Sequence, residues 1–589
     1  MSEPRAHYQG KLDERRARVA ALEERSKRIA NARLVCFLAA AAVAYFAVVR
    51  AIPPGWLAVP VLAFAALVIW HDRALRAQKR AMRAVAFYEH GLARIEDRWA
   101  GEGPTGERFM DSQHPFADDL DLFGEGSLFQ LLCTARTAGG EELLAGWLKE
   151  PSSAAEARGR QVEVAALRDR VQLREDLAVL GDDVRSEIDP GRLRAWGEAE
   201  VEALPGWARP AAAGLAALAI LAIAGWAWLD WGPLPLLVLV AVEYAMARLL
   251  RGRIEQAVAA VDRAGTDLGL LAELLARIER EDLPPGLRAL LGEGEASASK
   301  QIGELQKRVT LFEARYNQFF IPIGWLLLWD VQCAGAIGSW RRRCGRNLGG
   351  WMRAVAQLEA LCALAAYAFE HPADPFPELL EAGATFDGEQ LGHPLIPDAR
   401  CVRNDVDLRE GKRLILVSGS NMSGKSTYLR TVGINAVLAL AGAPVRARRL
   451  TLSAVRLGAT LRIQDSLQQG ASRFYAEITR LEKLLLLSAG DRPLLFLLDE
   501  VLHGTNSHDR LIGAEAVIRA LLDRGALGLV TTHDLALANL VEALGPLASN
   551  AHFADTVQDG KLVFDYRRHE GVVQQSNAIA LMRAVGLPV

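Results

Sequence analysis

Two uncharged arms near the N-terminus dominate the pattern of hydrophobic and polar positions. Residues 34–70 contain one charged side chain, Arg50, and a Pro-Pro-Gly turn follows shortly after it. Each arm comes close to the roughly 20 apolar residues that a helix needs to cross a bilayer. The pattern therefore predicts a charged N-terminal helix over 1–33 and a transmembrane hairpin over 34–71, with a buried helical pair in a soluble core as the alternative for the hairpin.

A second apolar pair is predicted at 205–250. Residues 211–229 are uncharged and long enough to span a membrane, but the return arm contains Glu243. Ionisable side chains are rare inside a membrane. Two alternatives therefore stay open for this pair: a second transmembrane hairpin, or two helices buried in a soluble core.

Basic residues flank the first pair at both ends. They are Arg25, Lys27, Arg28 and Arg33 before it and Arg73, Arg76, Lys79, Arg80 and Arg83 after it. The second pair is flanked by Arg209 and by arginines over 248–253, and its turn contains Asp230. Because Lys and Arg concentrate in cytoplasmic loops, we expect a multi-pass protein of the plasma or inner membrane whose soluble parts all lie in the cytoplasm.

The two regions 72–204 and 251–388 are predicted to be helical. Apolar residues recur there at spacings of three and four among charged residues, which is the pattern of amphipathic helices. Long helices are expected over 141–149, 159–180, 254–280 and 299–320.

Two short segments of the second helical region have more than one interpretation. Residues 319–329 are very apolar but contain Pro322, so a core or interface segment is favoured over a further span. Residues 341–346 contain four arginines, and they form either a solvated helix face or a contact for phosphate.

Composition excludes a generally basic protein. The 589 residues include 68 Lys and Arg against 71 Asp and Glu, for a net charge of -3. Nucleic acid or anionic lipid would therefore have to meet a local patch. The six cysteines form no C-x-x-C pair, which indicates a reducing compartment without a disulfide framework.

A phosphate-binding loop is predicted between a buried strand and a helix. Residues 413–418 form a short apolar run, and the pattern G-x-x-x-x-G-K-S follows at 419–426. In such a loop the backbone N–H groups surround phosphate oxygens, Lys425 reaches the β and γ phosphates, and Ser426 offers its hydroxyl to Mg²⁺. The predicted ligands are ATP and Mg²⁺. The residues expected to bind them from this loop are Gly419, Ser420, Asn421, Met422, Ser423, Gly424, Lys425, Ser426 and Thr427.

Two further strands are predicted to end in polar residues of the same site. The apolar run 494–498 ends in Asp499 and Glu500, and two acids there would be costly without a cation. We expect Asp499 to hold Mg²⁺ through water and Glu500 to accept a proton from the attacking water. The run 527–532 ends at His533, which is predicted to contact the γ-phosphate, with a structural role as the alternative. Lys425, Glu500 and His533 are thus the predicted catalytic residues.

These elements in this order resemble the ATPase domain of the MutS mismatch-repair family. The resemblance rests on GSNMSGKST at 419–427, GASRFYAE at 470–477, Asp499-Glu500 with GTNS at 504–507, and THD at 532–534. It is extended by HPLI at 393–396, Asn404-Asp405 and SNAIALMRAVGLP at 576–588, and more weakly by DLDLFGEGSLFQLL at 119–132.

Together with the hairpins predicted from the apolar arms, the resemblance implies a multi-domain protein in which helical transmembrane hairpins and a helical core and lever region precede a C-terminal α/β P-loop ATPase domain of ABC type at 389–589. It also implies a homodimer with composite sites. Ser472 would reach the γ-phosphate bound by the partner subunit, the loop 504–507 would cross the interface, and Asn421 would order phosphate or water. The alternative for Ser472 is an ordinary helix N-cap.

The sequence also departs from the family pattern. The segment before the first hairpin is only a short charged helix without a Phe-x-Glu wedge, and we expect no nuclease-like Smr domain after Val589. The aromatic platform for adenine is expected a few residues before Asn404, but 401–403 are Cys, Val and Arg. The resemblance is therefore to the membrane-anchored, truncated MutS-like group, and mismatch recognition of the usual kind is not expected.

Two functional hypotheses follow. The leading one is a membrane-anchored dimeric ATPase that couples ATP state to DNA or to a DNA-associated partner. The alternative is an ABC-like membrane ATPase that acts on a protein or lipid partner without binding nucleic acid. A transporter would need more spanning helices than two hairpins provide, unless the chain oligomerises.

Overall fold

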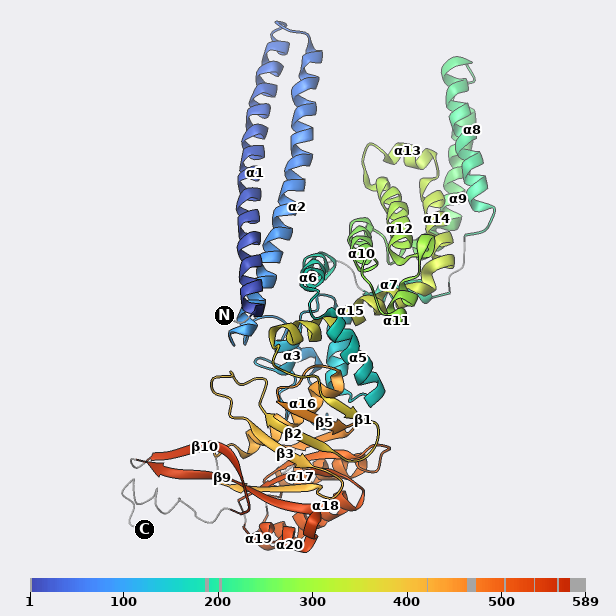
Figure 1. Ribbon diagram of the computed structural model, residues 1–589. Helices are drawn as coiled ribbons and strands as arrows, with labels where there is room; N and C mark the ends of the chain where they lie inside the picture. Colours follow the sequence, from blue (N-terminus) through green and yellow to red (C-terminus); the bar gives the residue numbers. More distant parts are fainter. Residues whose placement is uncertain are drawn as a thin grey trace.

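The structure is a computed structural model that describes residues 3–185, 190–200, 204–420, 422–462, 473–502, 505–533, 535–558 and 561–572. One helical hairpin is formed by α1 (Glu3–Val48) and α2 (Ala58–Ile95), and a second by α8 (Ala208–Trp228) and α9 (Leu234–Val258). Both hairpins project in the same direction from a helical middle region, and the β-sheets lie at the opposite end (Figure 1).

The charged N-terminal segment and the first apolar arm form one continuous helix, α1. Near its start Tyr8 is completely buried, its hydroxyl donates to Glu370 (3.1 Å), and its ring lies 5.7 Å from that of Tyr88 on α2. Farther along the hairpin, large apolar side chains such as Phe37 and Leu62 are exposed. The hairpin is therefore packed at its base and presents bare apolar surface toward its tip.

Small residues form the buried face of α8. Ala212 and Ala219 are buried, and a Cβ added at Gly225 would lie 2.3 Å from the indole of Trp231. The other faces of α8 expose side chains such as Leu221. On α9, Glu243 is buried.

Four helical stretches are long and apolar enough to cross a membrane: α1, Gly55–Ile95, α8 and Trp329–Glu370. The last is mostly buried inside the protein, so it belongs to the core of the middle region. Within the described part of the chain α9 is not one of the four, and its apolar stretch is interrupted by Glu243 and Arg248.

The middle region surrounds one central helix, α15 (Leu348–Glu370), which is buried along most of its length. The other helices are α3 (Leu128–Leu132), α4 (Ala138–Lys149), α5 (Ala154–Leu167), α6 (Val171–Arg185), α7 (Pro190–Glu198), α10 (Gly265–Ile278), α11 (Pro285–Leu291), α12 (Ala298–Glu313), α13 (Ile321–Leu326) and α14 (Trp329–Cys344).

The prediction of single long helices over 159–180 and 254–280 is wrong. The first is broken between α5 and α6, where the Arg174 guanidinium donates to the carbonyls of Leu167 (2.8 Å) and Arg168 (2.7 Å) and so satisfies the end of α5. The second is broken between α9 and α10, where the N–H of Gly265 donates to the Glu313 carboxylate (2.8 Å).

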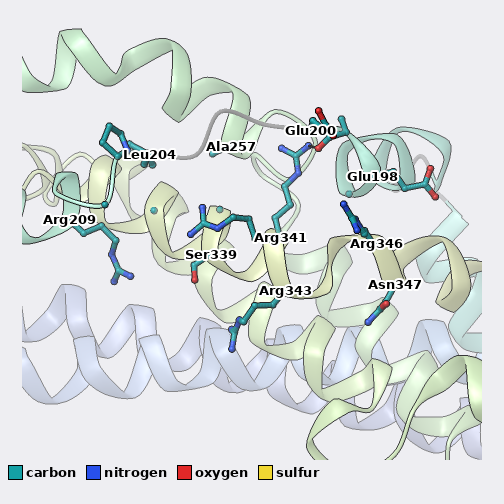
Figure 2. A pocket seen from close by; sticks show the side chains of 17 residues that line it. Glu198, Glu200, Leu204, Arg209, Ala257, Ser339, Arg341, Arg343, Arg346 and Asn347 are labelled. Carbon is teal, nitrogen blue, oxygen red and sulfur yellow. Dashed lines mark hydrogen bonds between the residues drawn. The ribbon is translucent and has the colours of Figure 1, made fainter.

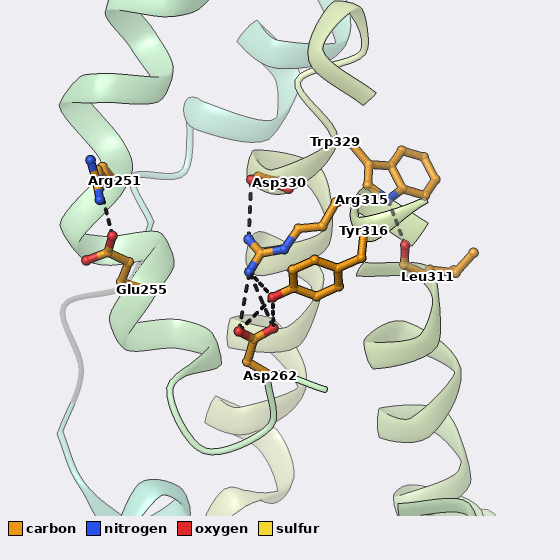
Figure 3. Close-up of polar contacts among 8 residues, drawn as sticks. All are labelled: Arg251, Glu255, Asp262, Leu311, Arg315, Tyr316, Trp329 and Asp330. Carbon is orange, nitrogen blue, oxygen red and sulfur yellow. Dashed lines mark hydrogen bonds and ion pairs between the residues drawn. The ribbon is translucent and has the colours of Figure 1, made fainter. Parts of the chain in front are cut away.

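The predicted helix 299–320 ends early, at Glu313, and an ionic network follows it. The Arg315 guanidinium lies 3.3 Å from the carboxylate of Asp262 and 3.4 Å from that of Asp330 (Figure 3). The Tyr316 hydroxyl donates to Asp262 at 2.9 Å. This network fixes the chain where it leaves α12.

The apolar segment 319–329 lies largely on the surface. Phe319 and Trp325 are exposed, and the Trp325 ring stacks on Tyr244 of α9 at 6.3 Å. A core position is therefore wrong for α13, and the interface alternative remains.

The C-terminal domain contains two sheets. Their strands are β1 (Glu378–Leu380), β2 (Phe386–Leu391), β3 (Asn404–Leu408), β4 (Leu414–Gly419), β5 (Arg449–Ser453), β6 (Arg456–Thr460), β7 (Leu494–Asp499), β8 (Leu527–Thr532), β9 (Ala548–Gln558) and β10 (Lys561–Glu570). The smaller sheet has the order β1-β5-β2-β3, and the larger one has the order β10-β9-β4-β8-β7-β6. In the larger sheet β10 is antiparallel to β9, and all the other pairs are parallel.

Helices cover both faces of the larger sheet. They are α16 (Lys425–Ala441), α17 (Arg473–Leu487), α18 (Ser507–Asp523), α19 (Leu535–Ala538) and α20 (Leu540–Leu544). Alternate residues of β4 divide between two cores: Val417 joins the core shared with α16 and the helical middle region, whereas Leu416 joins the core that includes residues of α17 and α18. The sheet is thus buried on both faces, as parallel sheets usually are.

Candidate active site

The phosphate-binding loop joins β4 to α16, as predicted. Gly419 and Gly424 have φ of +145° and +104°, conformations that side chains strongly disfavour. A Cβ at Gly419 would also lie 2.9 Å from the carbonyl oxygen of Phe553. Met422 stands exposed at the tip of the loop. The two glycines therefore let the backbone turn back above the sheet.

Lys425 begins α16 and folds over this loop. Its Nζ donates to the carbonyls of Gly419 (2.7 Å) and Ser420 (2.8 Å). The Ser420 hydroxyl is buried without a hydrogen-bond partner among the described residues. An ammonium and an unsatisfied hydroxyl in one loop fit the oxygens of a phosphate group.

Burial lowers the pKa of Lys425 below that of an ordinary lysine. The carboxylates of Glu500, Asp499 and Asp555 act in the opposite direction. Three acids therefore share the electrostatic environment of this lysine. Asp555, which lies on β9, was not predicted from the sequence.

The ends of three neighbouring parallel strands build the rest of the site. β8 lies between β4 and β7, so that Thr532 aligns with Ser418 on one side and Thr531 with Asp499 on the other. The Thr531 hydroxyl donates to Asp499 and accepts the N–H of Glu500 (3.0 Å). Thr531 thus orients both acids, a role that the sequence did not indicate.

His533 follows β8, and its Nδ1 lies 3.5 Å from the Glu500 carboxylate. The ring is partly exposed at the edge of the site. The structure therefore brings together Glu500 and His533, two of the predicted catalytic residues. A water or phosphate oxygen next to Glu500 would also be near this imidazole.

The donor set fits Mg²⁺. Ser426 is partly exposed and follows Lys425, whose ammonium lies within electrostatic range of Asp499. A hydroxyl and a carboxylate are hard oxygen ligands, and Mg²⁺ is commonly held by one or two carboxylates together with substrate phosphates. Ser426 would hold Mg²⁺ through its hydroxyl, and Asp499 would hold it through water.

Glu477 of α17 supports the turn that follows the two acids. Its carboxylate is buried and accepts the N–H of Leu502. Glu500 and Leu502 both have positive φ, +49° and +57°, so this turn is strained and needs such a partner. Glu477 closes the GASRFYAE block, but the sequence did not indicate what it holds.

An aromatic ring lies against the phosphate-binding loop. A Cβ at Gly424 would lie 3.2 Å from the ring of Tyr566, which sits where the β9–β10 pairing is interrupted. Asn404 holds this irregularity: its side chain donates to the carbonyl of Tyr566 (3.0 Å) and accepts the N–H of Arg568 (2.8 Å). This aromatic residue therefore comes from β10, whereas residues 401–403 offer no aromatic side chain.

The helical middle region reaches the site through two aspartates. Asp119 is fully buried and accepts the N–H groups of Leu461 (2.8 Å) and Arg462 (2.7 Å). Asp121 pairs with Arg430 of α16 (3.0 Å) and with Arg462 (2.7 Å). The segment that resembles the family's core thus contacts both the helix of the phosphate-binding loop and the strand exit before the GASRFYAE block.

Several predicted site residues lie outside the described residues. They are Asn421, Ser472 and Gly504, together with the block 576–588. The remainder of the 504–507 loop is described: Asn506 caps α18 by accepting the N–H of Asp509 (2.9 Å).

Comparison with known proteins supports this picture of the domain. Residues 415–589 match the family model "MutS domain V". A stretch of 214 residues is 35% identical to the endonuclease MutS2 of Thermus thermophilus, and it covers 35% of this chain and 27% of that protein. A stretch of 240 residues is 35% identical to the DNA mismatch repair protein MutS 2 of Halobacterium salinarum, over 40% of this chain and 27% of the relative.

A third relative shows the same extent of similarity. It is the DNA mismatch repair protein MutS of Natronomonas pharaonis, 34% identical over 245 residues, which cover 40% of this chain and 27% of that protein. The matches thus span about a quarter of the length of each of these three relatives.

Proposed function

The C-terminal region of this chain belongs to the MutS family, and from that premise we propose that the protein is a membrane-anchored ATPase that couples its nucleotide state to DNA or to a DNA-associated partner. The observation that carries the ATPase proposal is the convergence of three adjacent strand ends: the loop after β4, His533 after β8, and Asp499-Glu500 after β7.

Each residue of the site would have a separate role in ATP hydrolysis. Bound Mg²⁺ would supply charge neutralisation at the β and γ phosphates. Lys425 would leave the loop carbonyls for phosphate oxygens, and Asp499, held by Thr531, would hold Mg²⁺ through water. Glu500 would accept a proton from the attacking water. His533, whose Nδ1 lies 3.5 Å from the Glu500 carboxylate, would contact the γ-phosphate.

The contacts of Asp119 and Asp121 support a coupling function. They join the helical middle region to α16, which carries Lys425, and to the segment that leads toward Ser472. A nucleotide-dependent movement of either element would therefore change contacts in the helical region. Coupling of this kind requires an element whose position the nucleotide biases.

Membrane anchoring is supported by the apolar, exposed outer parts of α1, α2 and α8. Exposed apolar surface of this extent is unusual for a protein surrounded by water. Both hairpins point away from the ATPase domain (Figure 1), as a cytoplasmic domain beneath a membrane would require. We propose a homodimer in the plasma or inner membrane with all soluble parts in the cytoplasm.

A second candidate has support of its own. An ABC-like ATPase that acts on a lipid or protein partner would use the same nucleotide site, and the two hairpins give such a partner a place to bind. This candidate and the DNA-coupled one differ in what stimulates hydrolysis.

ATP hydrolysis by the detergent-solubilised full chain tests both candidates. It is measured without additions, with single-stranded, duplex and branched DNA, and with phospholipid vesicles, and Glu500→Gln serves as the inactive control. We expect branched or duplex DNA to stimulate hydrolysis. Stimulation by vesicles alone would favour the second candidate, and absence of any nucleotide hydrolysis would reject the ATPase proposal itself.

A further inference from the structure

A basic pocket lies at the base of the second hairpin. Its volume is about 750 Å³, and it is bounded by the end of α7, the start of α8 and the C-terminal half of α14 (Figure 2). This size is typical of sites for small molecules. The charged side chains that line it are Arg209, Arg341, Arg342, Arg343 and Arg346 on one hand and Glu198 and Glu200 on the other.

Arg341 is built into the wall of this pocket. It is 6% exposed, and its guanidinium lies 4.8 Å from the ring centre of Trp196. Trp196 stacks on Trp340 (6.4 Å) and donates its indole N–H to Ala257 (3.1 Å). The arginine is therefore held in one place by rigid aromatic neighbours.

No carboxylate neutralises Arg341 among the described residues. Its guanidinium donates to the carbonyls of Ala199 (3.0 Å) and Gln256 (3.5 Å), and its Nε is buried without a hydrogen-bond partner. Burial lowers the pKa of Arg341, but a guanidinium stays protonated at neutral pH. A buried, fixed and unneutralised cation of this kind is costly unless an anion binds to it.

The other charges of the pocket leave it positive. Glu198 is already paired with Arg194 at 2.8 Å, and Arg343 lies 3.7 Å from Glu304. Five arginines face two glutamates across the lining. The exposed Arg342 and Arg346 form no ion pair within the described part of the chain.

A second pocket, at the base of the first hairpin, provides a contrast. It is lined by seven arginines and three acids, and each of the three acids is paired with one of the arginines. Arg15 lies 2.7 Å from Glu175, Arg80 lies 2.7 Å from Glu273, and Arg277 pairs with Asp176 at 2.7 Å. The pairs of Arg15 and Arg80 join α1 and α2 to the middle region, and the pair of Arg277 lies within that region. In the α14 pocket, by contrast, the buried Arg341 has no carboxylate partner among the described residues.

The position of the α14 pocket indicates its ligand. Arg209 lies in the first turn of α8, and the uncharged stretch of that helix begins directly after it, at Pro210. Gly335 of α14 lies directly beneath Arg209, since a Cβ there would be 2.6 Å from the arginine side chain. The pocket therefore opens at the level where the proposed membrane span ends.

We propose that this pocket binds the phosphate headgroup of an anionic phospholipid in the cytoplasmic leaflet. The proposal rests on the membrane position proposed above for α8. Basic pockets at the cytoplasmic ends of spanning helices suit such headgroups, and guanidinium groups form strong paired hydrogen bonds with phosphate. A DNA duplex is less well suited, because its phosphates follow an extended surface and here the arginines line one concavity.

Native mass spectrometry of the full chain in an uncharged detergent tests this proposal. The protein is titrated with phosphatidylglycerol or with phosphatidylcholine. We expect phosphatidylglycerol to bind with at least about tenfold preference, and the double variant Arg342→Gln/Arg346→Gln to lose about tenfold in affinity. Arg353→Gln, an exposed arginine of α15 outside the pocket, is the matched control and is expected to bind like the wild type.

Several outcomes would overturn the proposal. Equal binding of phosphatidylcholine, or equal binding by the double variant and the wild type, would show that the arginines do not select an anionic headgroup. Displacement of the lipid by an equal concentration of inorganic phosphate would assign the pocket to a free anion, and displacement by a duplex would assign it to nucleic acid. Recovery of the chain in the soluble fraction without detergent would reject the membrane anchor separately, because lipid binding is measured on the purified protein.

Discussion

The guanidinium of Arg480 on α17 lies 3.0 Å from the carboxylate of Asp119, which is fully buried in the helical middle region. Burial raises the pKa of Asp119, whereas Arg480 and two backbone N–H groups lower it. One carboxylate thus joins three places of the ATPase domain: α17, Leu461 and Arg462. This junction therefore joins the helical region directly to the segment that precedes α17.

We expect Asp119→Asn to loosen this junction. The amide oxygen can still accept the two N–H groups, but Arg480 loses its counter-charge, and breaking a largely buried pair from one side is destabilising. The free energy of unfolding should fall by about 2 to 4 kcal/mol, measured by chemical denaturation of the solubilised protein. Asp118→Asn, next to it in the sequence, is the control and should change little.

A double-mutant cycle identifies the partner. If Arg480 is the main charge partner, Asp119→Asn combined with Arg480→Gln should cost clearly less than the sum of the two single changes. Additive losses would mean that the carboxylate acts through the backbone N–H groups alone.

The second prediction separates chemistry from binding. Glu500→Gln should keep ATP binding close to that of the wild type and lose at least about 100-fold in turnover, because it removes a proton acceptor. Lys425→Ala should instead raise the Kd for ATP, because the cation that folds over the loop is lost. Binding of a fluorescent ATP analogue and steady-state hydrolysis measure the two effects, and equal turnover in Glu500→Gln and the wild type would remove Glu500 as the base.

The chemistry of the site was predictable because the strands that carry it are buried on both faces. Such strands are continuous apolar runs, so the predictions of strands at 413–418, 494–498 and 527–532 agree with β4, β7 and β8 to within a residue. The turn residues at their ends then identify the loop, the two acids and the histidine.

What the sequence did not indicate depends on contacts between distant residues. The break before α10 is capped by Glu313, 48 residues away. The support of Leu502 by Glu477 and the position of Tyr566 against Gly424 likewise arise only in the folded domain. The hydrophobic periodicity of the sequence cannot show contacts of this kind, because each segment taken alone has the pattern of an ordinary helix or strand.

The third prediction concerns the base of the nucleotide. We expect the ring of Tyr566 to pack against the bound nucleotide, since it already lies over Gly424. Tyr566→Ala should raise the Kd for ATP about three- to tenfold, and Tyr566→Phe should leave it nearly unchanged because the ring remains. An unchanged Kd in Tyr566→Ala would exclude contact with the base, and a loss in Tyr566→Phe as large as in Tyr566→Ala would assign the effect to the hydroxyl.

The fourth prediction concerns topology. A cysteine at Pro54, in the turn of the first hairpin, should react with a membrane-impermeant maleimide on intact cells, and one at the exposed Met422 should react only after permeabilisation. The wild type gives the background, which should be low because four of its six cysteines are buried. Asp230→Cys tests the second hairpin in the same way, and its protection on intact cells would leave α8 and α9 on the cytoplasmic side.

The last prediction is that each active site is shared between two subunits. Within one chain the described residues provide a phosphate-binding loop, two acids and a histidine. Ser472 is expected from the family resemblance to act on the nucleotide of the partner. Lys425→Ala and Ser472→Arg should each abolish most hydrolysis when every subunit carries the change.

Mixing the two variant proteins distinguishes this arrangement from a site within one chain. In a mixed dimer one of the two sites combines an intact Lys425 with an intact Ser472 from the other chain, whereas the second site lacks both. Hydrolysis should therefore recover partially on mixing, and the recovery is limited by the fraction of dimers that are mixed. Coupling between the two sites can reduce the recovered activity further. Full activity of Ser472→Arg alone, or an active monomer at dilutions where no dimer survives, would place the whole site in one chain and leave Ser472 as a helix cap.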